Sequence, residues 1–217
     1  SVASTPWPAS PSGDCSSEDV DAAIDAGRRI TAVDDDPTPF VLMVREHPVL
    51  GPISRRVDSR IEMTPTVFET FAVAVIEQLV TGEEARASIN RLWRAAGEIV
   101  PGTTLVAAPT AAAVKRVPMW RMHELGIGAK RAVTLHHGAG RGAAIERLRN
   151  LAPDVALEKL QSLPGIGPWT ADYIAMRGLG DPDAFLPSDL VVRQVLGDLD
   201  GPVSVRAAEQ QSPPWRP

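Results

Sequence analysis

Three side chains in the second half of this 217-residue chain have types and spacing suited to chemistry. Trp169 and Tyr173 are four positions apart, so a helix places both rings on one face. Asp189 follows the Gly/Pro-rich stretch GLGDPDAFLPSD and stands at the start of the helical pattern DLVVRQVL. The N–H groups at the start of a helix favour the ionised form of such a carboxyl group. Electron-rich rings attract cationic groups, and a fixed anion stabilises a developing positive charge.

Each of these residues also has a plainer interpretation. Asp189, or Ser188 beside it, is well suited to cap the following helix and to do nothing more. Trp169 and Tyr173 are large aromatic residues of the kind that dominate core packing. Taken one at a time, these residues leave both interpretations open.

The stretch LPGIGPWTA at residues 163–171 predicts a tight turn between two helices. We expect the first helix to end near Gln161 and the second to start at Pro168, whose ring suits the first helical position. Gly165 and Gly167 can adopt positive φ, which lets the chain reverse and brings its backbone close to another molecule. The N–H groups that open the second helix then form a site for a phosphate group.

Two alternatives to a phosphate site remain for this turn. The main-chain carbonyl groups of Gln161, Leu163 and Ile166 form a tight set that could hold a monovalent cation, Na+ or K+. The turn could also be a glycine-rich connection without any ligand, because a Gly-x-Gly pair alone is weak evidence. A related string, ELGIGAKRAVTL at residues 124–135, is interpreted as packing.

The segments around these residues carry helical patterns. TPTVFETFAVAVIEQLV begins a strong one at residue 64, with a Thr66–Glu69 capping box and apolar residues at helical spacing. Another follows in GEEARASINRLWRAAGEI. Shorter helices are expected near residues 18–29, 38–47, 109–125, 129–138, 141–150 and 153–162, while FVLMV at 40–44 is ambiguous between helix and strand. Many short helices without strand alternation predict an all-α domain.

The composition is that of a globular protein, with 44% hydrophobic and 23% charged residues. There is no long apolar run and no signal-peptide pattern at the first residues, so we expect a cytoplasmic protein without a membrane partner. Cys15 is the single cysteine, which excludes an intramolecular disulfide and a cysteine-ligated iron–sulfur cluster. The net charge of −5 arises mainly from acidic residues within residues 1–36, so charge by itself does not favour a nucleic-acid partner.

The string LPGIGPWTA resembles the helix-hairpin-helix motif of DNA repair proteins, in which a hairpin binds a DNA phosphate without reading bases. Hairpin, Gly/Pro-rich loop and aspartate together resemble the helix-hairpin-helix/GPD superfamily of base-excision DNA glycosylases. Within it, LQSLPGIGPWTADYIAMRG followed by DAFLPSDLVVRQ is most similar to 3-methyladenine DNA glycosylase II, the AlkA-like branch. The resemblance covers roughly residues 47–196.

This resemblance implies an all-α helix-hairpin-helix DNA glycosylase fold and a division of the chain. We expect a disordered lead-in at residues 1–17, an N-terminal helical extension at 18–60 and the glycosylase domain at 61–217. The N-terminal β domain of the family is expected to be absent or reduced, because no strand pattern precedes the strong helices. The last helix of the family would follow Pro217, so we expect the domain to be truncated at its C-terminal end.

The resemblance also implies a role for each residue of the site. Asp189 is the catalytic carboxylate, and Trp169 and Tyr173 line the pocket for a base that has been flipped out of the duplex. The phosphate-binding hairpin comprises Gly165, Gly167 and Thr170.

The segment EQLV matches the part of the family that carries an apolar wedge, which fills the gap left by the flipped base. It points to Leu79, with Gln78 beside it, as the DNA wedge. The alternative is that Leu79 is a core residue on the apolar face of its helix.

Position 169 predicts the type of reaction. Bifunctional members of the superfamily carry a lysine two residues after the second hairpin glycine, and this lysine forms a Schiff base with the sugar. Trp169 occupies that position here, so the resemblance implies a monofunctional DNA N-glycosylase that leaves the strand uncut.

The expected substrates are alkylated purines of the 3-methyladenine and 7-methylguanine type in double-stranded DNA, because their positive charge suits aromatic stacking. We expect a monomer associated with the nucleoid that requires no cofactor, with Na+ or K+ at the hairpin in a structural role. Two alternatives remain: a glycosylase for another modified base such as hypoxanthine, and a damaged-DNA-binding protein without catalysis.

Overall fold

The computed structural model describes residues 16–48, 50–197 and 201–211. These residues form helices joined by loops and contain no strand; an isolated antiparallel bridge joins Ile99 and Val106. The all-α prediction is confirmed, and the ambiguous segment at 40–44 is helical. Most of the predicted lead-in at 1–17, with Cys15, lies outside the described residues, but Ser16 caps the first helix and Ser17 begins it.

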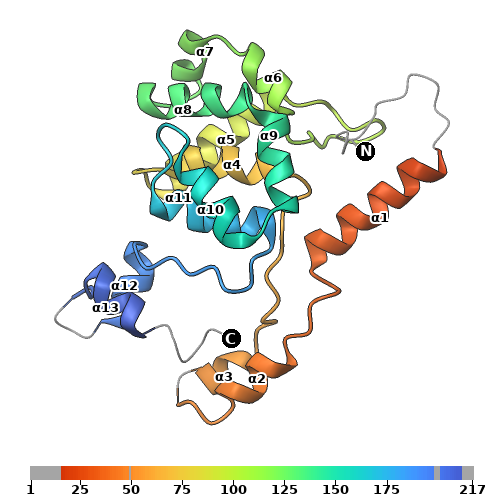
Figure 1. Cartoon of the computed structure of the whole chain (residues 1–217). Coiled ribbons are helices and arrows are strands. Elements are labelled where there is room, and N and C mark those ends of the chain that lie inside the picture. Colours follow the sequence, from red (N-terminus) through yellow and green to blue (C-terminus); the bar gives the residue numbers. More distant parts are fainter. Residues whose placement is uncertain (1–15, 49, 198–200, 212–217) are drawn as a thin grey trace.

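The helices follow one another along the chain, joined by both short turns and longer loops (Figure 1). In order they are α1 (Ser17–Thr31), α2 (Thr38–Val44), α3 (Leu50–Ser54), α4 (Val67–Glu77), α5 (Gly82–Ala96), α6 (Ala111–Arg116), α7 (Met119–Glu124), α8 (Ala129–Ala139), α9 (Gly142–Glu146), η1 (Arg147–Asn150, a 3₁₀ turn), α10 (Pro153–Gln161), α11 (Pro168–Ile174), η2 (Ala175–Leu179, a π turn), α12 (Leu190–Leu196) and α13 (Val205–Gln211).

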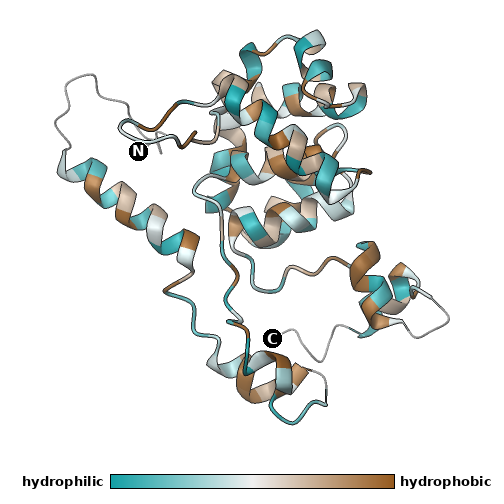
Figure 2. Ribbon diagram, turned by 180° about the vertical axis from the view of Figure 1, so that it is seen from behind, coloured by the Kyte–Doolittle hydropathy of each residue, from teal (hydrophilic) through white to brown (hydrophobic). Residues whose placement is uncertain are grey.

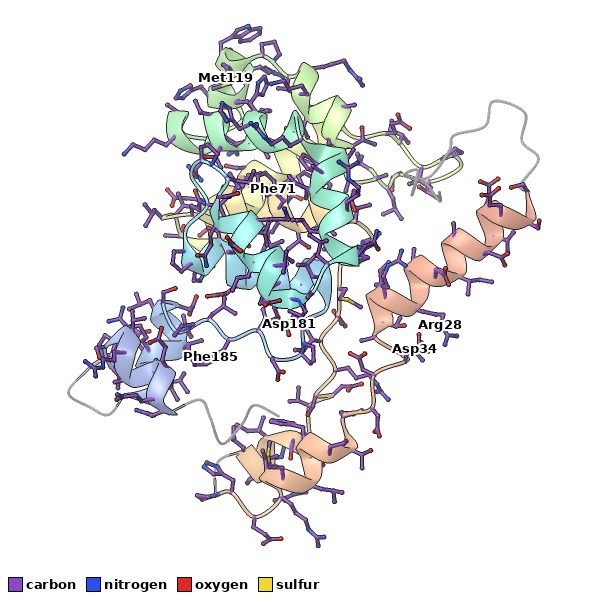
Figure 3. All side chains as sticks on the ribbon, in the orientation of Figure 1. Arg28, Asp34, Phe71, Met119, Asp181 and Phe185 are labelled. Carbon is purple, nitrogen blue, oxygen red and sulfur yellow. The ribbon has the colours of Figure 1, made fainter. Side chains whose placement is uncertain are left out.

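Helix α4 lies at the centre of the helical body. Its residues are apolar nearly all round, as expected of a helix enclosed on every side, and it packs against α5, α8, α9, α11 and η2. Phe71, which is fully buried, sits in the middle of this body (Figure 3). Helix α8 approaches closely at Gly138, where a Cβ atom would collide with the Phe71 ring.

The N–H groups at the start of α4 donate hydrogen bonds to two different side chains. Thr66 accepts a hydrogen bond from the Glu69 N–H, but the reciprocal bond of a full capping box does not form. Instead the Glu146 carboxylate, from α9, accepts from the N–H groups of Val67 at 3.1 Å and Phe68 at 2.9 Å. The predicted capping box is therefore wrong in its Glu69 half, and a carboxylate from a distant segment satisfies two other N–H groups at the start of the helix.

Three segments lie apart from the helical body: α1, the α2–α3 pair and the α12–α13 pair (Figure 1). Helix α1 buries none of its residues, and apolar side chains on α1 and α12 are exposed (Figure 2). Asp181 and Phe185 mark the segment that leads from η2 to α12 (Figure 3). The domain boundary at residue 61 stays a prediction. Within the described ranges, no helix combines the length and apolarity needed to cross a membrane.

Candidate active site

The predicted hairpin forms between α10 and α11, which pack against each other (Figure 1). Gly165 has a φ of +84°, and a Cβ atom there would collide with the Thr134 hydroxyl group of α8. Gly167 differs from the prediction: its φ is −93° and its backbone is extended, with open space where a Cβ would be. Only Gly165 therefore needs glycine for the turn itself, whereas Gly167 leaves room beside the first turn of α11.

The side chain of Gln78 joins this hairpin to the end of α4. Its Nε2 donates to the Gly165 carbonyl oxygen at 3.0 Å and to the Thr170 Oγ1 at 2.9 Å. Thr170 is buried, so its hydroxyl group lies inside the protein and only its main chain remains for a phosphate. The Gln78 side chain is thus hydrogen-bonded within the protein, and its predicted part in the wedge beside Leu79 stays a prediction.

Leu79 lies just beyond the end of α4, in the turn to α5. Its side chain is fully exposed and its backbone is left-handed, with a φ of +54°. The alternative that Leu79 is a core residue is wrong, because α4 ends at Glu77 and its apolar face stops before Leu79. Its role as a wedge stays a prediction.

Asp189 is the N-cap of α12 and also contacts the aromatic pair. Its Oδ1 accepts from the N–H groups of Val191 at 2.8 Å and Val192 at 3.0 Å. Its Oδ2 accepts from the Trp169 indole Nε1 at 2.8 Å. Asp189 therefore serves both as the helix cap and as a residue of the candidate site. The capping bonds hold one carboxylate oxygen, and the other oxygen faces Trp169. Ser188 does not cap the helix, and its hydroxyl group is buried without a hydrogen-bond partner.

Trp169 and Tyr173 stack on each other on one face of α11. Their ring centroids are 5.4 Å apart and their planes meet at 23°. Both side chains are half-buried, so they belong neither wholly to the core nor to the surface. Burial raises the pKa of the Tyr173 hydroxyl group, and the nearby Glu77 raises it further, against an opposing effect of Arg177. The phenol is therefore neutral at physiological pH, and the pair presents an electron-rich surface beside a carboxylate.

Comparisons with known proteins show that the chain is similar to DNA repair proteins, although no family model matches it. The Mycobacterium tuberculosis protein named "Probable bifunctional transcriptional activator/DNA repair enzyme AlkA" is 32% identical over 199 residues, which cover 88% of this chain and 39% of that protein. DNA-3-methyladenine glycosylase 2 of Escherichia coli K12 is 32% identical over 154 residues, 69% of this chain and 54% of that protein.

A solved structure has a similar fold. The 3-methyladenine DNA glycosylase from Archaeoglobus fulgidus matches with a TM-score of 0.81 at 21% identity, over 92% of this chain and 70% of that one. The chain is thus similar in sequence to AlkA-like DNA glycosylases, and it has the fold of a 3-methyladenine DNA glycosylase. This AlkA-like chain spans 39% and 54% of the two curated relatives.

One residue of the AlkA-like site was missed by the sequence interpretation. Glu77, the last residue of α4, is a second carboxyl group near Tyr173. Partial burial raises its pKa, and the positive charge of Arg177 opposes the rise. The available signal was its place directly before Gln78 and Leu79 in EQLV, the segment predicted to contact DNA.

The cation site predicted for the AlkA-like hairpin stays a prediction. The Leu163 carbonyl oxygen accepts a hydrogen bond from the Ile166 N–H at 3.1 Å, so its second lone pair could still bind a cation. In the part of the chain that the structure describes, no group of three or more His, Cys, Asp or Glu side chains could hold a metal ion.

A cavity of about 470 Å³ lies near α10. Its lining comes from α9, η1, the end of α10 and the start of the hairpin, and includes Arg141, Arg147 and Lys159. Neither Trp169 nor Asp189 lines it, so this cavity is not the predicted base pocket.

Proposed function

We propose that this protein is a monofunctional DNA N-glycosylase that removes alkylated purines of the 3-methyladenine and 7-methylguanine type from double-stranded DNA. The observation that carries the proposal is the hydrogen bond between Trp169 Nε1 and Asp189 Oδ2 at 2.8 Å, with Tyr173 stacked on Trp169. It joins an aromatic surface for a flat cationic base to a carboxylate for the sugar. The names of the two curated relatives agree with this class of reaction.

Asp189 would act on the sugar. Hydrolysis of an N-glycosidic bond passes through a sugar with oxocarbenium character, which a nearby anion stabilises, and the same carboxylate can activate the attacking water. Three N–H donors fix the orientation of the Asp189 carboxylate before any substrate arrives. A group oriented in advance needs no reorganisation during the reaction, which is why such stabilisation is effective.

Trp169 and Tyr173 would hold the base. A methylated purine carries positive charge, so it is attracted to the faces of electron-rich rings. The same charge weakens the glycosidic bond, so the reaction does not need a strong general acid.

The lysines of the chain favour a reaction without strand cleavage. A lyase step requires an amine that attacks the sugar. Lys115, Lys130 and Lys159 belong to α6, α8 and α10, while α11 carries Trp169 at the position where bifunctional relatives have lysine. The protein would therefore leave an abasic site in an intact strand.

The hairpin would bind a DNA phosphate through main-chain N–H groups near Gly167, where the structure has open space. A Na+ or K+ ion on the carbonyl groups of Gln161, Leu163 and Ile166 would add positive charge at the same place. Affinity for duplex DNA in K+ should then exceed affinity in Li+ at equal ionic strength, and equal affinities would argue against the ion.

The proposal is tested by incubating the protein with methylated duplex DNA and identifying the released bases. We expect 3-methyladenine or 7-methylguanine in solution and strands that break only after alkali treatment. Strand breaks without alkali would contradict the monofunctional assignment. Release of hypoxanthine alone from an inosine-containing duplex would reassign the substrate, and binding of damaged duplex without any release would leave a DNA-binding protein.

A further inference from the structure

The turn that carries Leu79 is held from two sides. From α8, Arg131 Nη1 donates to the carbonyl oxygen of Ile76 at 2.6 Å, in the last turn of α4. From the hairpin, the Gly165 carbonyl oxygen and the Thr170 hydroxyl group accept from Gln78 Nε2. Two residues that closely precede the exposed Leu79 side chain, Ile76 and Gln78, are therefore hydrogen-bonded to α8 and to the hairpin.

This exposed turn requires support because its backbone is strained. Leu79 adopts a left-handed conformation, with a φ of +54°, that residues with a side chain disfavour. Its side chain is fully exposed, so packing of the side chain does not hold the conformation in place. The two ties on Ile76 and Gln78 are the hydrogen bonds that fix the position of the turn relative to α8 and to the hairpin.

The partners of Gln78 determine which atom of its amide faces the hairpin. The Gly165 carbonyl oxygen can only accept, so the NH2 group of Gln78 must point to it. The same NH2 group reaches the Thr170 hydroxyl group, which is buried in the first turn of α11. A glutamate at this position would supply no donor and would place a carboxylate against a carbonyl oxygen.

We propose that Gln78 is a positioning residue that couples the Leu79 turn to the hairpin, so that the two DNA-contacting elements reach the duplex as one rigid unit. This inference rests on the proposed function, because it assumes that Leu79 enters the duplex and that the hairpin binds the backbone. Gln78 itself then acts through Leu79 and makes no contact with DNA.

The test is a double-mutant cycle on DNA binding, which requires no base release. The probe is a duplex that contains a stable abasic-site analogue, with an undamaged duplex of the same sequence as reference. The variants are Gln78→Ala, Leu79→Ala, the double variant and Gln78→Glu; the control is Gln210→Ala, an exposed glutamine on α13. The midpoint of thermal unfolding is measured for every variant.

We expect Gln78→Ala and Gln78→Glu to weaken binding to the abasic duplex about tenfold, the loss of two modest hydrogen bonds. In the Leu79→Ala background, Gln78→Ala should change the affinity by less than about twofold, because the element that Gln78 positions is then missing.

Additive losses in the double variant would overturn the coupling, since a direct contact of Gln78 with DNA would persist without Leu79. Wild-type affinity of Gln78→Glu would overturn it as well, because the donor would then be dispensable. A lowered unfolding midpoint with unchanged DNA affinity would show a purely structural role. A wild-type protein that does not prefer the abasic duplex would instead contradict the DNA contacts of the proposed function, and this result is visible before any variant is compared.

Discussion

The indole Nε1 of Trp169 donates a hydrogen bond of 2.8 Å to Oδ2 of Asp189. This bond links α11, which follows the hairpin, to the N-cap residue of α12 across the Gly/Pro-rich loop. The loop is therefore part of the site, because its conformation sets the position of the carboxylate relative to the indole. Trp169, which the resemblance aligns with the lysine of bifunctional members, thus contacts the carboxylate.

Replacing Trp169 with phenylalanine tests this bond directly. Trp169→Phe keeps an aromatic ring against Tyr173 but removes the donor to Asp189. A hydrogen bond to a charged group contributes about 1.5–3 kcal/mol, so we expect the single-turnover rate of base release to fall by about tenfold or more. Substrate affinity should change less than the rate. A rate equal to that of the wild type would show that the carboxylate needs no orientation by the indole.

Replacing Leu79 with glycine should raise stability and lower activity. Leu79→Gly relieves the left-handed backbone, so we expect the free energy of unfolding to rise by up to about 1 kcal/mol. The same change removes the exposed side chain, and release of a methylated base from duplex DNA should fall several-fold. Denaturant titration and a base-release assay measure the two effects. A stable variant with full activity would remove Leu79 from the DNA contact.

The two hairpin glycines should respond differently to alanine. Gly165→Ala forces a residue with a side chain into a φ of +84° and against Thr134, so we expect a loss of about 2–4 kcal/mol of stability. Gly167→Ala meets open space at a φ of −93° and should change stability by less than about 0.5 kcal/mol.

For Gly167→Ala we expect weaker binding to duplex DNA despite the intact fold, because the added methyl group occupies the space beside the phosphate. Binding to undamaged and abasic duplexes should fall by a similar factor. Unchanged affinity in both would place the DNA backbone elsewhere.

Glu69 makes stability depend on pH. Burial raises the pKa of its carboxyl group, and the neighbouring Glu146 raises it further. The folded protein therefore binds the proton more tightly than the unfolded chain, so this contribution to stability is complete below the ordinary glutamate pKa and is lost as the pH rises through the folded value.

We expect Glu69→Gln to stabilise the protein at pH 7 and to have little effect near pH 4, with the difference appearing as the pH rises between them. Thermal unfolding at a series of pH values measures it, and Glu158→Gln, at an exposed site on α10, is the control. A constant difference across the whole pH range would show that Glu69 acts through packing and not through its charge.

The elements that depend on local sequence could be predicted. The turn at Gly165, the start of α11 at Pro168 and the helix after Asp189 are determined by residues close to one another along the chain. The resemblance placed Trp169 and Asp189 in the same site, but the hydrogen bond between them was not predicted.

The contacts between distant segments could not be predicted. Gln78 precedes Thr170 by 92 positions, and Glu146 lies 78 positions from the Phe68 N–H that it accepts from. Both side chains satisfy polar main-chain or hydroxyl groups that only the packed helices bring near. The exposure of Leu79 also depended on where α4 ends, and apolar periodicity alone extended that helix too far.

The most direct test of the central claim is the single-turnover release of 7-methylguanine from methylated duplex DNA by wild-type protein and by Asp189→Asn, with Asp21→Asn on α1 as a control. The asparagine keeps the shape of the side chain and can still accept hydrogen bonds, but it lacks the negative charge. We predict that Asp189→Asn releases the base at least about 100-fold more slowly while it still binds the duplex. Release by Asp189→Asn at the wild-type rate would contradict the account.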